Sequence, residues 1–158
     1  MALPAKPASI SVVNMTELVL PGHTNALGSI FGGQIVSWVD IAAAIAAQRH
    51  SGQICVTASI DDLHFIAPVY KGWVVNIKAQ VNYVHKTSME IGVRVDAENP
   101  MKNQWFHTAS AYLTFVALDP QGKPVEIPPL LLDTDESKRR HAAAIQRREF
   151  RLKRRRIK

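Results

Sequence analysis

The chain has 158 residues, of which 47% are hydrophobic and 20% are charged. A chain of this length and composition can bury one core, which excludes a disordered or fibrous protein and favours a single globular domain. Its net charge of +6 is unevenly spread. Residues 138–158 hold eleven basic side chains and one acidic side chain, whereas the rest of the chain holds eight basic and twelve acidic ones. The basic character therefore belongs to the C-terminal segment and not to the domain.

Several classes of protein are excluded by what the sequence lacks. No apolar run reaches the length of a membrane span, and the first residues have no continuous apolar core of a secretory signal, so we expect a cytoplasmic protein that does not bind membranes. The single cysteine, Cys55, excludes an internal disulfide and is expected to be a small core residue. The six histidines are scattered without zinc-site spacing, so we expect no metal.

The first third of the chain predicts a strand and then a long helix. Residues 1–10 hold two prolines and are expected to form a flexible N-terminal segment. Weak alternation over residues 11–20 predicts a strand that ends at a Pro-Gly turn. Residues 31–49 are apolar nearly all round, which predicts a buried helix, and Gly52 is a typical residue just past a helix end.

The remaining chain predicts a sheet and a second helix. Short turns join the later strands, so the sheet is expected to be antiparallel. Residues 134–151 read as a helix with acidic residues in its first turn and basic residues later, which suits the helix dipole. We therefore predict an α+β domain over residues 11–132, followed by a basic C-terminal helix and tail over residues 133–158. The expected strands are residues 54–65, 73–85, 89–97 and 106–118.

One carboxylate lies in the middle of the apolar helix. Gln34, Ser37 and Asp40 are spaced by three residues, so they form one polar stripe along the helix. An ionised group in apolar surroundings is costly, and no basic residue lies within a turn of Asp40. Asp40 is therefore the first candidate for a catalytic residue.

The start of the same helix offers unpaired backbone amides. Gly32 and Gly33 leave the N–H groups of the first turn unobstructed, and such groups can stabilise a carbonyl oxygen that gains negative charge. The alternative is that the glycines only permit close packing. Gly33 and Asp40 are separated by about 10 Å along the helix axis. They can act on one reacting carbon only if they come from different chains, so we expect an active site at a dimer interface.

The helix and the loop before it together carry a motif of spaced residues. The residues of the motif are Asn25, Gly28, Phe31, Gly32, Gly33, Gln34 and Asp40. In their order and spacing they resemble the acyl-CoA thioesterase branch of the hotdog superfamily. The stretches 81–95 and 122–130 also resemble bacterial acyl-CoA hydrolases of this branch, and the likeness extends over about residues 12–148.

The resemblance implies a fold, an assembly and a reaction. The implied hotdog fold has a long central helix wrapped by a curved antiparallel sheet, and two chains form a homodimer with one continuous sheet; members commonly assemble as trimers of dimers. The implied reaction is hydrolysis of fatty acyl-CoA to free fatty acid and CoA, without a cofactor. Asp40 matches the catalytic general base or nucleophile, Asn25 the polar residue from the other chain, and the amides of Gly32 and Gly33 the group that polarises the thioester carbonyl.

Substrate-binding candidates lie outside this motif as well as within it. The turn at residues 86–88 offers a cation and two hydroxyls, which suit the phosphates of CoA, although an ordinary polar turn has the same composition. Arg94 lies in an apolar strand and is expected to face solvent or a ligand phosphate. His23 is expected to be an ordinary loop histidine. The candidates are Gln34, Thr57, Lys86, Thr87, Ser88 and Arg94.

Two other functions compete with hydrolysis. A hotdog hydratase or dehydratase needs a histidine paired with the acid, but the nearest in sequence beyond the helix, His50, lies about 15 Å past Asp40 along the axis. An acyl-CoA-sensing or nucleic-acid-binding hotdog protein could use the basic tail on phosphates. The tail lacks interleaved aromatic residues beyond Phe150 and no DNA-binding motif precedes the domain, so we do not expect nucleic acid.

Overall fold

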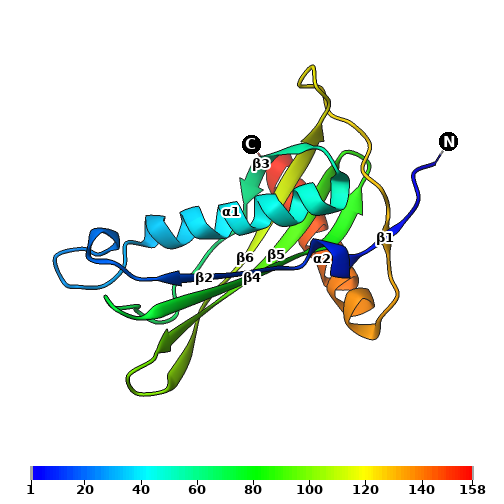
Figure 1. Ribbon diagram of the computed structural model, residues 1–158. Helices are drawn as coiled ribbons and strands as arrows, with labels where there is room; N and C mark the ends of the chain where they lie inside the picture. The colour runs from blue at the N-terminus through cyan, green and yellow to red at the C-terminus, as the bar shows by residue number, and fades with distance from the viewer. Residues whose placement is uncertain (1, 158) are drawn as a thin grey trace.

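A curved antiparallel sheet wraps around one long helix in the computed structural model, which describes residues 2–157. The helix is α1 (Gly32–Ser51), and it lies along the concave face of the sheet (Figure 1). Short connections join the three long central strands, as their alternating patterns predict. In sheet order the strands are β2 (Val13–Leu18), β4 (Val74–His85), β5 (Ser88–Asn99), β6 (Gln104–Leu118) and β3 (Ile54–Ile60).

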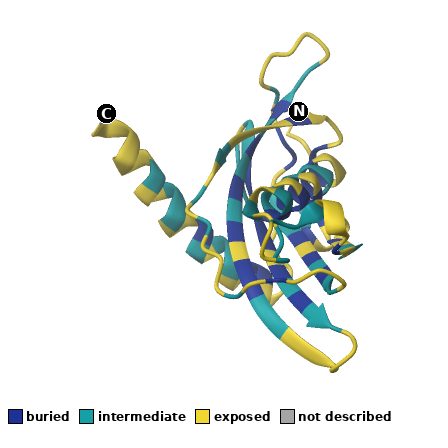
Figure 2. Ribbon diagram, turned by 90° about the vertical axis from the view of Figure 1, so that its left-hand side faces the viewer, coloured by how far each residue is buried: buried dark blue, intermediate teal, exposed yellow. Residues whose placement is uncertain are grey.

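The core lies between α1 and the concave face. Alternate residues of β5 point toward the helix and are buried, while the residues between them face the other side of the sheet. Small residues on α1 let the helix approach the strands closely, and four of its alanines are fully buried: Ala42, Ala43, Ala46 and Ala47. Figure 2 shows the resulting buried layer between helix and sheet.

The ends of α1 follow local sequence signals. Phe31 has extended backbone and precedes the first helical residue, and the helix ends where Gly52 takes a left-handed conformation at φ 70°. The predicted helix over residues 31–49 is therefore confirmed, with two more residues at its C-terminal end.

The second helix, α2 (Asp135–Arg156), lies on the convex face of the sheet, opposite α1 (Figures 1 and 2). Thr134 caps it, because its hydroxyl accepts a hydrogen bond of 3.0 Å from the Ser137 amide. The helix continues five residues beyond the predicted end at residue 151. Neither α1 nor α2 is apolar enough over its described length to cross a bilayer.

The predicted strand over residues 54–65 is too long. β3 ends at Ile60, and its register against β6 shifts between Thr57 and Ser59. Residues 61–66 continue beside β6 without regular pairing. Two hydrogen bonds hold them there: the Asp61 amide donates to the Tyr112 carbonyl, and the Ile66 amide donates to the Thr108 carbonyl. After the register shift, regular pairing resumes at Ser59 and Ile60 and then ends, so residues 61–65 do not extend the strand.

Residues near the N-terminus form two short elements. Residues 6–11 form β1 (Lys6–Pro7) and the short helix η1 (Ala8–Ser11), and β1 pairs in parallel with β7 (Leu130–Leu131). The Lys6 ammonium donates a hydrogen bond of 3.1 Å to the His50 carbonyl at the end of α1. A second short helix, η2 (Pro21–His23), follows β2.

Candidate functional site

The carboxylate of Asp40 is joined to the edge strand. Thr57 Oγ1 donates a hydrogen bond of 2.7 Å to Asp40 Oδ1, which links β3 to the middle of α1. Asp40 is half-buried rather than enclosed in the core, because the sheet does not cover the side of α1 that carries it. None of the ion pairs within residues 2–157 includes Asp40. A partly exposed anion held by one hydroxyl keeps an oxygen available for proton transfer.

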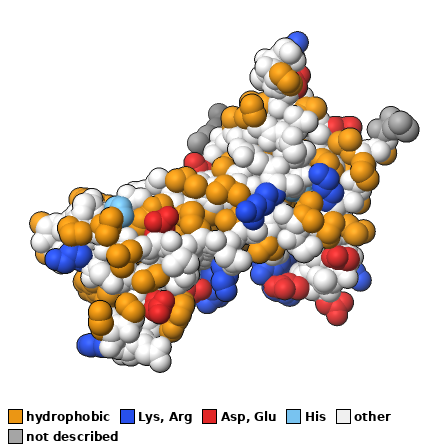
Figure 3. Space-filling view, viewed as in Figure 1, with side chains coloured by type: hydrophobic (Ala, Val, Ile, Leu, Met, Phe, Trp, Pro, Cys, Tyr) orange, Lys and Arg blue, Asp and Glu red, His pale blue; other side chains and the backbone are white. Residues whose placement is uncertain are grey.

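The surface around Asp40 and Thr57 is apolar, and it includes a strand edge that pairs with no other strand of this chain. β3 is one of the two edge strands of the sheet, so one row of its backbone groups has no neighbouring strand. Ile41 on α1 is 48% exposed and Val56 on β3 is 43% exposed. Figure 3 shows hydrophobic side chains gathered along the face that carries α1. An exposed apolar edge next to a carboxylate is typical of a surface that a second chain covers.

Asn25 lies in the loop before α1, where its side chain is held in place. Its Oδ1 accepts hydrogen bonds from the amides of Leu27, at 2.9 Å, and Ser29, at 3.3 Å, while its Nδ2 donates to Ser29 Oγ at 3.0 Å. The loop is fastened to the helix entrance, since the Phe31 amide donates to the His23 carbonyl. Asn25 is therefore fixed near the N-terminal end of α1.

His23 is more than an ordinary loop residue. Its Nδ1 accepts a hydrogen bond of 3.0 Å from the Leu20 amide, and its ring packs edge-on against Trp38 of α1 with 5.1 Å between centroids. These contacts fix the loop that carries the candidate Asn25 against the first half of α1.

Gly32 and Gly33 are the first two residues of α1, and they differ in their surroundings. Within residues 2–157, neither amide donates to a backbone carbonyl outside the helix. A Cβ on Gly32 would approach the Phe65 ring to 3.0 Å, whereas a Cβ on Gly33 would meet no atom within 4 Å. Close packing therefore explains Gly32, while Gly33 is exposed and leaves its amide open. Gln34, in the same turn, is half-buried.

The turn at residues 86–88 lies at the other end of α1. Phe115 on β6 pairs with Thr57 on β3 and with Met89 on β5. The turn that precedes Met89 therefore lies two strands away from Thr57, near the C-terminal end of the helix. Backbone bonds fix it, because the Thr87 carbonyl accepts from Ala117 and the Lys86 carbonyl accepts from Ile127. Lys86 has a positive φ of 51° and is exposed, and Ser88 donates to His85 O at 3.2 Å.

Arg94 is on the convex face, away from Asp40. It belongs to the residues of β5 that face α2, and its Nε lies 3.0 Å from Asp96 Oδ2. The bond to Asp96 raises the pKa of Arg94 above its usual value. One protomer thus brings Asp40 and Thr57 together, but it does not bring Arg94 or the turn at residues 86–88 to that pair.

A buried ion pair on the convex face joins β5 to α2 and includes none of the site residues predicted from the sequence. Glu90 is 1% exposed, and its carboxylate lies 2.7 Å from Arg147 Nη2 and 3.1 Å from Arg151 Nη1. Arg151 also reaches Asp61 at 2.8 Å, and the Arg147 guanidinium lies 3.7 Å above the ring of Tyr112. Part of the basic C-terminal segment therefore anchors α2 to the sheet. A lone carboxylate inside the apolar start of β5 was the signal for this contact.

Within residues 2–157, His50 does not lie beside Asp40 as a hydratase would need, and no cluster of metal ligands is found. His50 is buried at the end of α1, where its Nε2 lies 2.8 Å from the Pro128 carbonyl. Burial lowers the pKa of His50 below its usual value, an effect that the Pro128 bond opposes. Within residues 2–157, no three metal-ligating side chains come together. Cys55 is buried as predicted, and burial raises the pKa of its thiol.

Known proteins resemble the chain in sequence. The family model described as Thioesterase superfamily matches residues 27–103. The uncharacterized acyl-CoA thioester hydrolase YkhA of Bacillus subtilis is 38% identical over 146 residues, which cover 92% of this chain and 85% of that protein. Acyl-coenzyme A thioesterase 11 of Mus musculus is 41% identical over 140 residues, which cover 89% of this chain; the chain spans only 23% of the length of that relative.

Solved structures agree with these matches. An apo-hexameric acyl-CoA thioesterase superposes with a TM-score of 0.92 and 38% identity, over 96% of this chain and 97% of that one. An acyl-CoA hydrolase of Staphylococcus aureus, solved in complex with butyryl coenzyme A, coenzyme A and coenzyme A disulfide, has a TM-score of 0.89 and 37% identity, over 96% and 93% of the two chains. By sequence and by its hotdog fold, the chain belongs to the acyl-CoA thioesterase branch of the thioesterase superfamily.

Proposed function

We propose that this protein hydrolyses the thioester of fatty acyl-CoA, with Asp40 as the catalytic carboxylate. The hydrogen bond from Thr57 to Asp40 is the observation that carries the proposal. Thr57 occupies one carboxylate oxygen, so the other oxygen can take a proton from an attacking water molecule. The resulting hydroxide adds to the carbonyl carbon, the C–S bond breaks, and the proton on Asp40 passes to the departing thiolate. The products are the free fatty acid and CoA.

The carbonyl oxygen needs donors that Asp40 cannot supply. The open amide of Gly33 and the neighbouring Gly32 amide are suited to stabilise the negative oxygen of the tetrahedral intermediate. Because about 10 Å of helix separates them from Asp40 in one chain, the proposed site combines the carboxylate of one protomer with the amides and Asn25 of its partner. The exposed apolar edge at β3 supports pairing of two chains there.

Variants of the Staphylococcus aureus hydrolase support this choice of residues. Solved structures of that protein include separate alanine variants of one asparagine, one aspartate and one threonine. In that protein the aspartate follows the asparagine by 15 positions and precedes the threonine by 17. Asn25, Asp40 and Thr57 have the same separations here. We therefore assign these three residues to one composite site, and the hexameric relatives support a trimer of dimers as its setting.

The phosphates of CoA need a binding site of their own. We propose that the exposed Lys86, with the hydroxyls of Thr87 and Ser88, binds the phosphates of a substrate molecule whose thioester lies in a site shared with the partner chain. Gln34 in the first turn of α1 is a further substrate contact in this proposal.

A hydrolysis panel tests the function. Acyl-CoA thioesters from acetyl to palmitoyl are supplied to the full chain, and release of free thiol is followed. We expect turnover of at least one fatty acyl-CoA and its loss in Asp40→Asn, while binding of CoA to the variant persists. Turnover of no member of the panel by the wild-type chain contradicts the function, and full activity of Asp40→Asn contradicts the role of the carboxylate.

A further inference from the structure

A serine, a histidine and an aspartate are joined by hydrogen bonds on the convex face of the sheet. Ser110 Oγ lies 3.2 Å from Nε2 of His107, and Nδ1 of His107 lies 3.3 Å from Asp96 Oδ1. Ser110 and His107 belong to β6, and Asp96 belongs to β5. A hydroxyl, an imidazole and a carboxylate linked in this order form the arrangement in which a histidine activates a serine as a nucleophile.

A bulge in β6 brings the histidine to this face. The register between β5 and β6 shifts just before Asp96, which pairs with His107, so Thr108 is an extra residue in β6. Thr108 and Ala109 are consecutive and both buried, and His107 therefore lies on the same side as Ser110. In a regular strand the side chain of His107 would point to the opposite face of the sheet. The bulge thus aligns the three side chains.

The two hydrogen bonds determine which nitrogen of the neutral histidine carries the proton. An ionised carboxylate only accepts, so Nδ1 of His107 carries the proton and donates it to Asp96. Nε2 of the neutral ring is then an acceptor, and the hydroxyl of Ser110 donates to it. The side chains of His107 and Asp96 are 31% and 20% exposed, whereas Ser110 is exposed. The reactive oxygen is therefore open to a substrate, while the carboxylate behind the histidine holds the ring in place.

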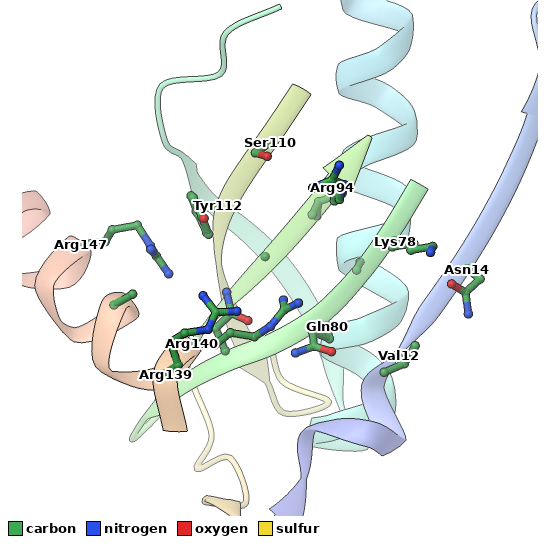
Figure 4. A pocket seen from close by; sticks show the side chains of 15 residues that line it. Val12, Asn14, Lys78, Gln80, Arg94, Ser110, Tyr112, Arg139, Arg140 and Arg147 are labelled. Carbon is green, nitrogen blue, oxygen red and sulfur yellow. The ribbon is translucent and has the colours of Figure 1, made fainter. Parts of the chain in front are cut away.

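A cation lies beside the same hydroxyl. Arg94 pairs with Ser110 across β5 and β6, and its Nε donates to both oxygens of Asp96. Among the hydrogen bonds within residues 2–157, the two Nη groups of Arg94 have no acceptor. Figure 4 shows Arg94 and Ser110 on adjacent strands at the wall of a hollow of about 310 Å³, with Lys78 on the next strand. Free guanidinium N–H groups beside the serine can stabilise a carbonyl oxygen that gains negative charge.

We propose that Ser110 is the nucleophile of a second hydrolytic site, which acts on activated esters of short acids through an acyl-serine intermediate. Ser110 Oγ attacks the carbonyl carbon, its proton passes to His107 Nε2, and the C–O bond breaks as the leaving alcohol takes that proton. Water then gives a proton to His107 and attacks the acyl-serine, and the serine oxygen leaves with that proton. The products are the acid and the alcohol.

The size and the place of the hollow suit this reaction. Its volume lies at the lower end of the range for small-molecule sites, which favours a short acyl group over a long one. Within one protomer the sheet separates Ser110 from Asp40, because α1 lies along the concave face. The second site is therefore distinct from the carboxylate of the same chain.

Labelling of the full chain by a fluorophosphonate, which reacts with activated serine hydroxyls, tests the nucleophile without relying on acyl-CoA hydrolysis. Mass spectrometry of peptides locates the label, and we expect it on Ser110. Ser110→Ala should lose the label. Ser9→Ala removes an exposed hydroxyl that makes no hydrogen bond within residues 2–157, and it should keep the label. Hydrolysis of p-nitrophenyl acetate by Asp40→Asn measures turnover at the second site alone, and adding Ser110→Ala should abolish it.

His107→Gln tests whether the histidine activates the serine. Glutamine can still donate to Asp96 but cannot take up the proton of Ser110, so labelling should slow by about a hundredfold or more. His64→Gln changes an exposed histidine and should keep the wild-type rate. The proposal is overturned if Ser110 is not labelled in the wild-type chain, if His107→Gln is labelled as fast as wild type, or if Ser110→Ala leaves ester turnover by Asp40→Asn unchanged. Failure of the acyl-CoA panel leaves the labelling result intact, so the two proposals fail independently.

Discussion

Thr57 Oγ1 lies 2.7 Å from Asp40 Oδ1, so a hydroxyl on the edge strand orients a carboxylate in the middle of the central helix. The bond links an edge strand to a helix whose carboxylate side the sheet leaves open. The proposed chemistry depends on that orientation, because only a correctly turned carboxylate can take a proton from water.

Replacing Thr57 by valine tests the orientation. Valine keeps the shape of threonine and removes the donor, so we expect kcat for acyl-CoA hydrolysis to fall by about ten- to a hundredfold, the range of one hydrogen bond to a charged group. Thr57→Ser, which keeps the hydroxyl, should recover most of the rate. Thr16→Val removes a hydroxyl that donates to Asn76 on another part of the sheet, and it should leave kcat unchanged. Equal rates for Thr57→Val and wild type contradict the role of the bond.

Removing Glu90 should destabilise the protein. In Glu90→Leu the guanidinium groups of Arg147 and Arg151 lose their buried partner. Both are partly exposed and Arg151 keeps Asp61, so we expect a loss of about 1–3 kcal/mol. Urea unfolding measures the free energy, and hydrogen exchange in residues 135–156 should rise as α2 loosens. Glu98→Gln, on the same strand, is the control. A loss of stability below about 1 kcal/mol shows that α2 docks without this contact.

The stability of the protein should fall in mild acid because of His50. Burial lowers the pKa of His50, so the unfolded chain takes up a proton near the usual pKa of 6.5 while the folded chain does not. The unfolded state then binds more protons, and stability is lost as the pH falls below about 6.5.

Melting temperatures at pH 7.5 and 5.5 measure this effect. His50→Gln can still donate to the Pro128 carbonyl, and its melting temperature should fall less between the two pH values than that of wild type. His64→Gln changes an exposed histidine and should keep the wild-type difference. If the melting temperature of His50→Gln falls between the two pH values by as much as that of wild type, His50 is not the cause of the loss of stability.

The predictable parts of this fold come from local patterns. Periodicity and the glycine after the helix placed α1 to within two residues of its end, and alternation found the three long strands. The turn at residues 86–88 and the side of β5 that bears Arg94 also followed from pattern. These features depend on residues that are neighbours in the chain, so they can be predicted from the sequence alone.

The contacts that the sequence could not predict join distant segments. The sequence predicts Thr57 as a substrate-binding residue but not its bond to Asp40, because that approach depends on where β3 pairs with β6 and on the register shift beside it. Glu90 is not among the predicted site residues, since its burial depends on the docking of α2 against the sheet. Long-range register and docking are set by the whole core and not by local propensity.

The central claim is that one protomer supplies Asp40 while its partner supplies Asn25 and the amides of Gly32 and Gly33. Co-refolding equal amounts of Asp40→Asn and Asn25→Ala chains tests it, with hydrolysis of a fatty acyl-CoA as the readout. Half of the dimers then contain both chains, and each of these has one site with no substitution and one site with two. We predict that activity rises to about a quarter of the wild-type value, above the mean of the two separately refolded variants. A mixture no more active than that mean contradicts the claim.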